Sequence, residues 1–269
     1  MMTATQANDD APAALLERRG HTALITLNRP KALNAVNADL SAAVGAALEE
    51  FASDPELRVA VLTGAGRAFC AGMDLKAAAA GLPVMAPGHE DWGFGGVVSH
   101  WVDKPLIAAV NGPALGGGAE IVLACDLAVA NENAVLGLPE VRRGLIPGAG
   151  GAIRLPRLIP RNAALEMVLT GEPVTAATAA DWGLVNRVAP AGKSVEVALE
   201  LAEVIAAGAP LALGAVKRLV HASPRLGSDW DSAAWAENDR EWDLIRASED
   251  ALEGPQAFVE KRPPRWTGR

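Results

Sequence analysis

Two glutamates are the side chains of this sequence best placed for acid–base chemistry. Glu120 lies in the first turn of a predicted helix that is otherwise apolar, and Glu140 follows Leu138-Pro139 at the end of a predicted strand. If both carboxylates share one low-dielectric pocket, their pKa values move apart and supply an acid and a base. Alternatively, Glu120 only compensates a helix dipole, and Glu140 is an ordinary surface residue.

Two glycine turns could supply backbone donors near these carboxylates. Gly116, Gly117 and Gly118 precede Glu120, and Gly72 precedes Met73. Each turn follows a predicted buried strand and opens a helix. Its amides are therefore unshielded and lie at a positive helix end, which suits an oxyanion or a phosphate. The alternative is a pair of close-packed turns in which a Cβ would clash.

The composition narrows the remaining chemistry. The 269 residues include 27 Gly and 7 Trp, but no Tyr, only 4 His and only 2 Cys. Tyr-based acid chemistry is therefore excluded, and Cys70 and Cys125 lack the CxxC spacing of a thiolate zinc site. The histidines accompany no GxSxG nucleophile motif, so we expect them to be packing or solvent-exposed residues. Cys70, in apolar company, is expected to be a buried structural thiol.

Charge and hydropathy exclude further classes of protein. The net charge of −8 argues against a nucleic-acid binder. A small anionic ligand stays possible, because a few local bases or a helix N-terminus can hold it. No apolar run reaches the roughly 18 residues of a membrane helix, and the first ten residues do not resemble a signal peptide. We therefore expect a cytoplasmic protein with no membrane partner.

Alternating strands and helices over the first two-thirds of the chain predict an α/β fold. Predicted strands cover residues 21–27, 59–63, 106–110, 126–130, 134–138 and 184–188, and predicted helices follow Asn37, begin near Ala119 and span 174–182. From Ser194 onward the spacing of apolar residues is helical. Four of the seven Trp residues lie there, which suggests an interface between subunits.

These patterns divide the chain into three parts. We expect a flexible N-terminal tail at 1–13, an α/β core at 14–193 and a C-terminal helical oligomerisation region at 194–269. Within the core, the Ala/Gly/Pro-rich residues 77–97 are expected to form a mobile loop.

The order of motifs resembles the enoyl-CoA hydratase/isomerase family, the crotonases. The resemblance covers about residues 14–269 and rests on ITLNRPKALNA (25–35), VAVLTGAGRAFCAGMDL (59–75), KPLIAAVNGPALGGGAEIVLACDLAVA (104–130), LPEVRRGLIPGAGGAIRLPRLI (138–159) and SEDALEGPQAFVEKR (248–262). It implies a crotonase-type spiral of ββα repeats with a C-terminal helical trimerisation region. It also implies a homotrimer, or a hexamer built as a dimer of trimers.

The resemblance also implies a reaction and a site. The substrate would be an acyl-CoA thioester, with its carbonyl oxygen held by the amides of Met73 and Gly117. Glu120 would act as base on a water molecule and Glu140 would protonate the α-carbon. Further substrate and CoA contacts would come from Lys31, Ala32, Leu33, Ala71, Asp74, Leu75, Lys76, Gly116, Gly148, Phe258 and Lys261. Neither a metal nor a separate cofactor is implied.

Among crotonase activities, the two glutamates favour an enoyl-CoA hydratase of the kind used in β-oxidation. The alternatives are an enoyl-CoA isomerase, a crotonobetainyl-CoA hydratase, which the C-terminal SEDALEGPQAFVEKRPPRWTGR resembles, and a non-catalytic acyl-CoA binder. The chain departs from the family pattern over 77–97, which would line the acyl pocket. It also departs at Arg142-Arg143, which we interpret as a solvated helix start.

Overall fold

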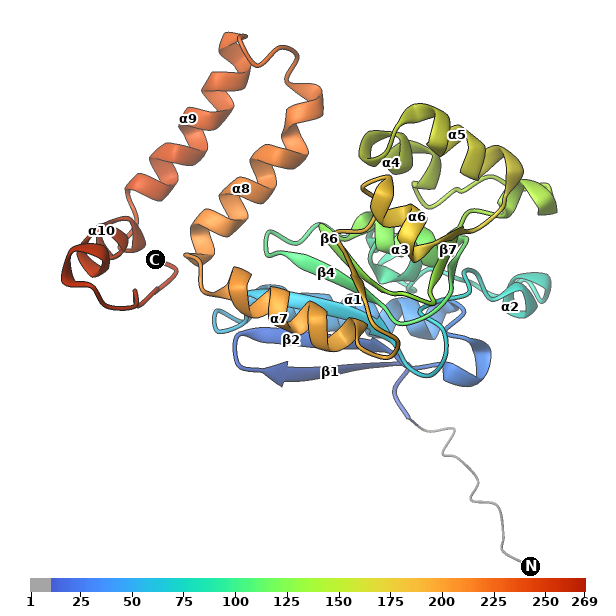
Figure 1. Ribbon diagram of the computed structural model, residues 1–269. Helices are drawn as coiled ribbons and strands as arrows, with labels where there is room; N and C mark the ends of the chain where they lie inside the picture. The colour runs from blue at the N-terminus through green and yellow to red at the C-terminus, as the bar shows by residue number, and fades with distance from the viewer. Residues whose placement is uncertain (1–10) are drawn as a thin grey trace, which may run out of the picture.

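A six-stranded sheet forms the centre of the molecule (Figure 1). The structure, a computed structural model, describes residues 11–269, so the predicted tail at 1–13 lies outside it except for its last three residues. The strand order is β1 (Ala14–Arg19), β2 (Thr22–Leu27), β3 (Val59–Gly64), β4 (Leu106–Val110), β6 (Leu127–Asn131) and β9 (Arg187–Ala189). β1 pairs antiparallel with β2, and the remaining neighbours are parallel. A second sheet combines β5 (Ala114–Leu115), β7 (Val135–Gly137) and β8 (Val174–Thr175).

Both faces of the main sheet are covered, which explains its uninterrupted apolar strands. Alternate residues of β3 point to opposite faces, as the pleat requires. Ala60 and Leu62 pack in the cluster that contains α1 (Ala38–Ser53), whereas Val59 and Val61 pack in the cluster that contains α7 (Ser194–Ala206). The predicted helix after Asn37 is confirmed, because the Asn37 side chain accepts the Leu40 amide at 3.1 Å and caps α1.

The remaining helices flank this sheet and extend beyond it. α2 (Leu75–Ala79), α3 (Gly117–Ala124), α4 (Gly151–Leu158), α5 (Arg161–Thr170) and α6 (Ala176–Asp181) belong to the first 193 residues. After α7 come α8 (Pro210–Ala222), α9 (Ser232–Arg246) and α10 (Asp250–Glu260). Figure 1 shows α8 and α9 side by side and projecting away from the sheet, whereas α7 lies across it. Within the expected helical region, only α7 therefore packs on the main sheet.

Three parts of the secondary structure differ from the sequence prediction. β1, β5, α4 and α5 have no predicted counterpart, and Pro156 inside α4 obscures its helical pattern. The predicted helix at 174–182 begins with the two residues of β8. The predicted strand at 184–188 is shifted to β9, because Leu184 and Val185 are buried in the core without pairing in the sheet.

The prediction of a mobile loop at 77–97 is wrong for its second half. Short 3-10 helices occupy Glu90–Trp92 and Phe94–Gly96, and Phe94 and Val97 are buried in the core. The Trp92 ring covers Gly45 of α1 so closely that a Cβ at Gly45 would lie 2.0 Å from it. The loop is anchored because a glycine on α1 leaves room for this ring.

Within residues 11–269, no single helix is long and apolar enough to cross a membrane. Ser194–Ala206 and Pro210–Arg225 reach the required length and apolar character only when the two segments are counted together, and the chain bends by 107° between them.

Asn34 joins the segment after β2 to the segment after β3. Its side chain is fully buried, and Nδ2 shares its two N–H groups among the carbonyl oxygens of Ala65, Ala68 and Phe69 at 2.9 to 3.1 Å. Its Oδ1 accepts the Arg29 amide at 2.9 Å. The backbone of Asn34 is left-handed, with φ of 57°, which Asn tolerates better than most residues. One side chain therefore fixes two chain segments that lead toward the same end of the sheet.

We expect Asn34→Ala to lower the free energy of unfolding by about 3 kcal/mol, because it leaves several buried backbone groups without partners. Urea unfolding at fixed protein concentration measures the loss. Asn162→Ala is the matched control, because Asn162 is exposed near the start of α5 and should change stability by less than about 0.5 kcal/mol. Equal effects of the two substitutions would contradict this role of Asn34.

Candidate active site

A cavity of about 830 Å³ collects residues from several of these elements. Its walls come from the turn before α2, the start of α3, the loop around Phe94, the segment after β7 and the start of α4. Eight of the predicted site residues line it, namely Ala71, Met73, Leu75, Gly116, Gly117, Glu120, Glu140 and Gly148. The two glycine turns and the two glutamates, predicted from separate segments, therefore meet in one cavity.

The amides of Met73 and Gly117 are available to a ligand. A parallel bridge joins Val36 to the turn, with the Val36 amide donating to Gly72 O at 2.8 Å and the Asp74 amide donating to Val36 O at 2.9 Å. This bridge skips the Met73 amide, which therefore points to its other side. Gly117 is the first residue of α3, where an amide has no partner inside the helix. Neither amide donates to an acceptor within residues 11–269.

The two turns are in direct contact, and glycine is required for that contact. Gly72 has φ of 90°, and a Cβ there would lie 2.8 Å from Leu115 O and 3.2 Å from the Gly117 nitrogen. At Gly117 a Cβ would lie 2.3 Å from the Phe94 ring. Any side chain at Gly72 would push the turns apart, so the close-packing interpretation of these glycines is confirmed, and it leaves the amides of Met73 and Gly117 available to a ligand.

Glu120 is a buried carboxylate with one strong partner. It is 3% exposed, and its Oε1 accepts the amide of Gly151, the first residue of α4, at 2.8 Å. Burial raises the pKa of Glu120, the Gly151 hydrogen bond opposes that rise, and the nearby charge of Glu140 adds to it. Arg154 attracts the ionised form. Glu120 is thus held in place and shielded from water while it keeps a bonded partner for its charge.

Glu140 faces the same glycine turn but lacks such a partner. Burial raises the pKa of Glu140, and its own backbone amide and the charge of Arg143 oppose that rise. A Cβ at Gly116 would lie 3.2 Å from Glu140 Oε1, so the carboxyl group lies over the start of α3. Its Oε2 is buried and makes no hydrogen bond within the described residues. A buried oxygen without a partner is well suited to donate or accept a proton on a bound ligand.

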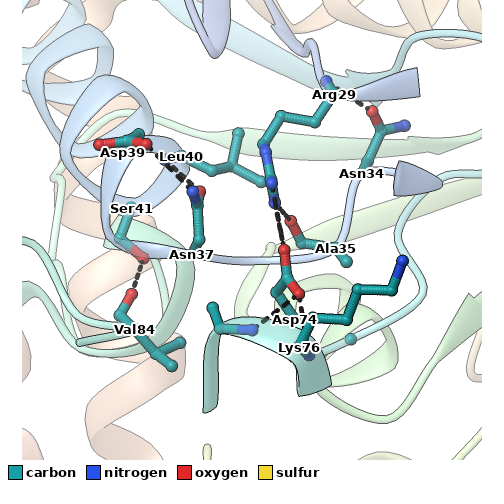
Figure 2. A network of polar contacts seen from close by, with 12 residues as sticks. Arg29, Asn34, Ala35, Asn37, Asp39, Leu40, Ser41, Asp74, Lys76 and Val84 are labelled. Carbon is teal, nitrogen blue, oxygen red and sulfur yellow. Dashed lines mark hydrogen bonds and ion pairs between the residues drawn. The ribbon is translucent and has the colours of Figure 1, made fainter. Parts of the chain in front are cut away.

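An ion pair holds the turn that carries Met73. Figure 2 shows Arg29, after β2, reaching Asp74 at the N-terminus of α2, with both guanidinium Nη atoms 3.1 Å from Asp74 Oδ2. Asp74 Oδ1 accepts the Lys76 amide at 3.1 Å and the Ala77 amide at 3.2 Å, which caps α2. Burial disfavours the Asp74 carboxylate, but these hydrogen bonds and Arg29 outweigh it and lower its pKa. The structure gives Asp74 this positioning role next to the cavity.

The other predicted CoA contacts lie outside the cavity lining. Lys31 and Ala32 form a short 3-10 helix with Pro30, and Leu33 O accepts the Ala71 amide at 3.0 Å, so this segment borders the turn at 71–76. Lys76 is exposed on α2. Phe258 is exposed on α10 and Lys261 ends that helix, and neither lines the cavity within this chain.

Sequence reasoning missed three arginines of the cavity wall, namely Arg143, Arg154 and Arg157. Phe94 also lines the cavity and belongs to the stretch 77–97, which is predicted to line the acyl pocket. Arg142 and Arg143 are both exposed in a short 3-10 helix, as the solvated interpretation expects. Arg142 pairs with Glu172 and donates to Thr170 O at 2.8 Å, whereas Arg143 also lines the cavity. A signal was present in the i, i+3 spacing of Arg154 and Arg157, which places both on one helix face directly after a glycine turn.

The remaining candidate groups lie outside this cavity. None of the four histidines lines it, and His89 and His100 stack on either side of Trp92. Cys70 is fully buried, and burial raises the pKa of its thiol to about 12, as expected for a structural thiol. In the part of the chain that is described, no three His, Cys, Asp or Glu side chains are grouped so that they could hold a metal ion.

The fold and the cavity define an α/β protein in which two glycine turns with free amides, one buried glutamate and one half-buried glutamate line the same cavity. Residues 17–269 match the model of the enoyl-CoA hydratase/isomerase family. The chain belongs to this family, the crotonases.

The similar proteins are named either for enoyl-CoA or for carnitinyl-CoA. A carnitinyl-CoA dehydratase from Salmonella typhi is 46% identical over 261 residues, covering 94% of this chain and 98% of that protein. The crystal structure of an enoyl-CoA hydratase from Mycobacterium tuberculosis H37Rv is 45% identical with a TM-score of 0.90, covering 96% of this chain and all of the other. The crystal structure of a carnitinyl-CoA hydratase from Mycobacterium avium is 53% identical with a TM-score of 0.77. The match covers 96% of this chain and 100% of that chain. These matches support a lyase that acts on CoA esters.

Because the charge of Glu140 raises the pKa of Glu120, we expect Glu140→Gln to lower the pKa of Glu120. Burial is the larger cause, so the pKa of Glu120 should stay above its ordinary value in the variant. Carbon NMR titration of the glutamate carboxyl groups measures this shift. Glu56→Gln, at an exposed residue away from the cavity, is the control. An unchanged Glu120 pKa in E140Q would show that the two carboxylates do not interact.

Proposed function

We propose that this protein catalyses the reversible addition of water to a 2-enoyl-CoA thioester, which gives a 3-hydroxyacyl-CoA. One observation carries the proposal: a buried and a half-buried glutamate, both with raised pKa values, share a cavity with two backbone amides that have no acceptor within residues 11–269. In the hydration direction, the reaction needs a base for water, a proton donor for carbon and a site for a developing oxyanion. The cavity offers one group for each need.

The amides of Met73 and Gly117 would hold the thioester oxygen. As hydroxide from water adds to the β-carbon, the π electrons of the conjugated double bond move toward this oxygen and form an enolate. Two preorganised N–H donors stabilise that charge more strongly than they stabilise the neutral carbonyl, and one such donor contributes about 3 to 4 kcal/mol in comparable sites. The barrier to addition is lowered because the enolate is stabilised more than the bound substrate.

The two glutamates then complete the addition. Glu120 takes a proton from water, the oxygen bonds to the β-carbon, and Glu140 transfers a proton to the α-carbon, so that one water is added in total. The environments support this division. Burial raises the pKa of both carboxyl groups, opposed by Gly151 and Arg154 at Glu120 and by its own backbone amide and Arg143 at Glu140. The Gly151 hydrogen bond fixes the Glu120 carboxylate, whereas Glu140 Oε2 has no partner among the described residues and is free to carry the proton for the α-carbon. The reverse sequence of steps removes water.

A second candidate function has the same reaction but a different acyl group on the substrate. The identity to proteins named carnitinyl-CoA dehydratase favours crotonobetainyl-CoA, which carries a trimethylammonium group on its acyl chain. Both candidates use the same glutamates and amides, so they differ only in what the cavity wall accepts. An isomerase or a non-catalytic binder needs only part of this arrangement.

CoA and the oligomer belong to the same proposal. We propose that CoA passes along the segment of Lys31 to Leu33 and the exposed Lys76, which border the turn at 71–76.

We propose a homotrimer, or a dimer of trimers, whose C-terminal helices make the subunit contacts. Exposed Trp235, Trp242 and Phe258 on α9 and α10 support this, because large apolar residues are enriched at interfaces.

We expect Glu120→Gln and Glu140→Gln each to lower kcat for hydration of crotonyl-CoA by about 100-fold or more, because each removes a general acid or base. Loss of the enoyl-thioester absorbance measures the rate, and circular dichroism checks that the variants are folded. Glu132→Gln is the matched control, since Glu132 does not line the cavity. Full activity in either cavity variant would contradict its assigned role, and binding without turnover in the wild type would favour the non-catalytic binder.

A second variant tests the amide pair. Gly72→Ala would separate the two turns, so kcat/KM should fall by about 100-fold, as it does when one oxyanion donor is lost. Gly81→Ala is the matched control, because Gly81 has a similar φ of 69° but open space around its Cβ position. Both substitutions place alanine at a positive φ, 90° at Gly72 and 69° at Gly81, so both strain the backbone. If both lower kcat/KM equally, strain rather than the amide pair accounts for the loss.

A further inference from the structure

Three positively charged side chains line the cavity together with the two glutamates. Arg143 lies on the 3-10 helix of Glu140, and Arg154 and Arg157 lie on α4; Arg143 and Arg157 are exposed at the cavity. No other charged side chain among residues 11–269 lines this cavity. The proposed mechanism keeps one of the two carboxylates protonated, so the lining carries three positive charges and one negative charge when substrate arrives.

The proposed mechanism sets the direction of a bound substrate relative to these arginines. The thioester oxygen would be held by Met73 and Gly117, and the β-carbon would lie between the two glutamates. Glu120 is hydrogen-bonded to Gly151, the first residue of α4, and α4 carries Arg154 and Arg157. With CoA along the segment of Lys31 and Lys76, as proposed above, acyl atoms beyond the β-carbon would extend toward α4, and Arg143 follows Glu140 on the same 3-10 helix at the cavity.

Arg154 is fixed in position by the protein. Its guanidinium donates to Val98 O and, at 3.3 Å, to Ala149 O, and a Cβ at Gly150 would lie 2.4 Å from its Nη1. These carbonyl partners leave its positive charge in place. The Glu120 carboxylate would attract a cation, but its charge is shared with the Gly151 amide and offset by Arg154.

Within residues 11–269, the cavity lining has no aromatic cage of the kind that recognises a quaternary ammonium. Such ligands are commonly bound by a cage of several aromatic rings. Phe94 is the one aromatic side chain among the described residues that line the cavity, and its ring packs on Gly117. The sequence has no Tyr, and the Trp residues lie elsewhere. Ile146 and Ile153 complete the wall with apolar surface.

We propose that Arg143 and Arg157 determine acyl specificity, so that the cavity accepts an uncharged or carboxylate-bearing acyl chain and disfavours a trimethylammonium group. The proposal rests on the proposed hydratase function and names its substrate class. It places the chain apart from the carnitine-type candidate, even though relatives named for that activity are similar over nearly the whole chain.

Three substrates with the same four-carbon enoyl unit test this. Crotonyl-CoA ends in a methyl group, glutaconyl-CoA carries a carboxylate on that carbon, and crotonobetainyl-CoA carries a trimethylammonium group there. We expect kcat/KM for crotonobetainyl-CoA to be at least about tenfold below that for crotonyl-CoA, which corresponds to about 1.4 kcal/mol. Glutaconyl-CoA should be hydrated at least as well as crotonyl-CoA, and added salt should narrow these differences.

Replacing Arg143 and Arg157 tests whether these two side chains cause the differences in kcat/KM among the three substrates. In the double variant Arg143→Gln, Arg157→Gln, the ratio of kcat/KM for crotonobetainyl-CoA to that for crotonyl-CoA should rise severalfold, and the glutaconyl-CoA ratio should fall. Arg142→Gln is the matched control, because Arg142 neighbours Arg143 but does not line the cavity. Ratios within one variant cancel any general loss of folded enzyme.

The outcomes separate this proposal from the hydratase proposal. Preference for crotonobetainyl-CoA, or unchanged ratios in the double variant, would overturn the role of the arginines while hydration stands. If none of the three is hydrated, the hydratase proposal fails. The arginines are then tested by dissociation constants of the saturated butyryl-, glutaryl- and γ-butyrobetainyl-CoA, measured by calorimetry. Weakest binding of the trimethylammonium ligand, relieved in the double variant, supports the proposal, and equal binding of all three contradicts it.

Discussion

The contact between two glycine turns is the constraint on which the site depends. The turn at Gly72 follows β3 and the turn at Gly117 follows β5, and they meet so closely that a single methyl group at Gly72 would not fit. Arg29, Asp74 and the bridge to Val36 hold the first turn, while Gly137 O and α3 hold the second. The two free amides therefore keep a fixed separation before any ligand binds, and catalysis by charge stabilisation requires this preorganisation.

Burial of the two glutamates costs folding stability. A carboxyl whose pKa is higher in the folded state binds more protons there than in the unfolded chain, so its contribution to stability is fully present below the unfolded pKa and is lost as pH rises through the raised folded pKa. At neutral pH both groups therefore weaken the fold. The covered sheet, the Asn34 hydrogen bonds and the Asp74 cap offset this cost from outside the cavity. A loss of folding stability from buried ionisable groups is expected at an active site, where function and stability compete.

Local chemistry explains which features could be predicted from sequence. The buried strands, the Asn37 cap, the glycine turns and both glutamates have short-range signals, namely apolar runs, a capping side chain and glycine before a helix. The missed features depend on tertiary contacts. Residues 90–97 have a low-complexity sequence, yet they are ordered because Gly45 on another helix admits the Trp92 ring. Arg143 and Arg142 are indistinguishable in sequence, and only the course of the chain after Glu140 turns one toward the cavity and the other toward Glu172.

Similarity to known proteins likewise says more about the reaction of this protein than about the acyl group of its substrate. In the proposed reaction, the glutamates and the amides would act on the enoyl thioester that all hydratases of this family would share, so similarity over the whole chain reports on them. The acyl group beyond the β-carbon would meet a few side chains on α4 and after β7, and these can change without affecting the turns or the glutamates. At 46% identity more than half of the aligned positions differ, which leaves ample room for a changed wall. The charge of the wall is therefore a stronger argument about the acyl group than the names of similar proteins are.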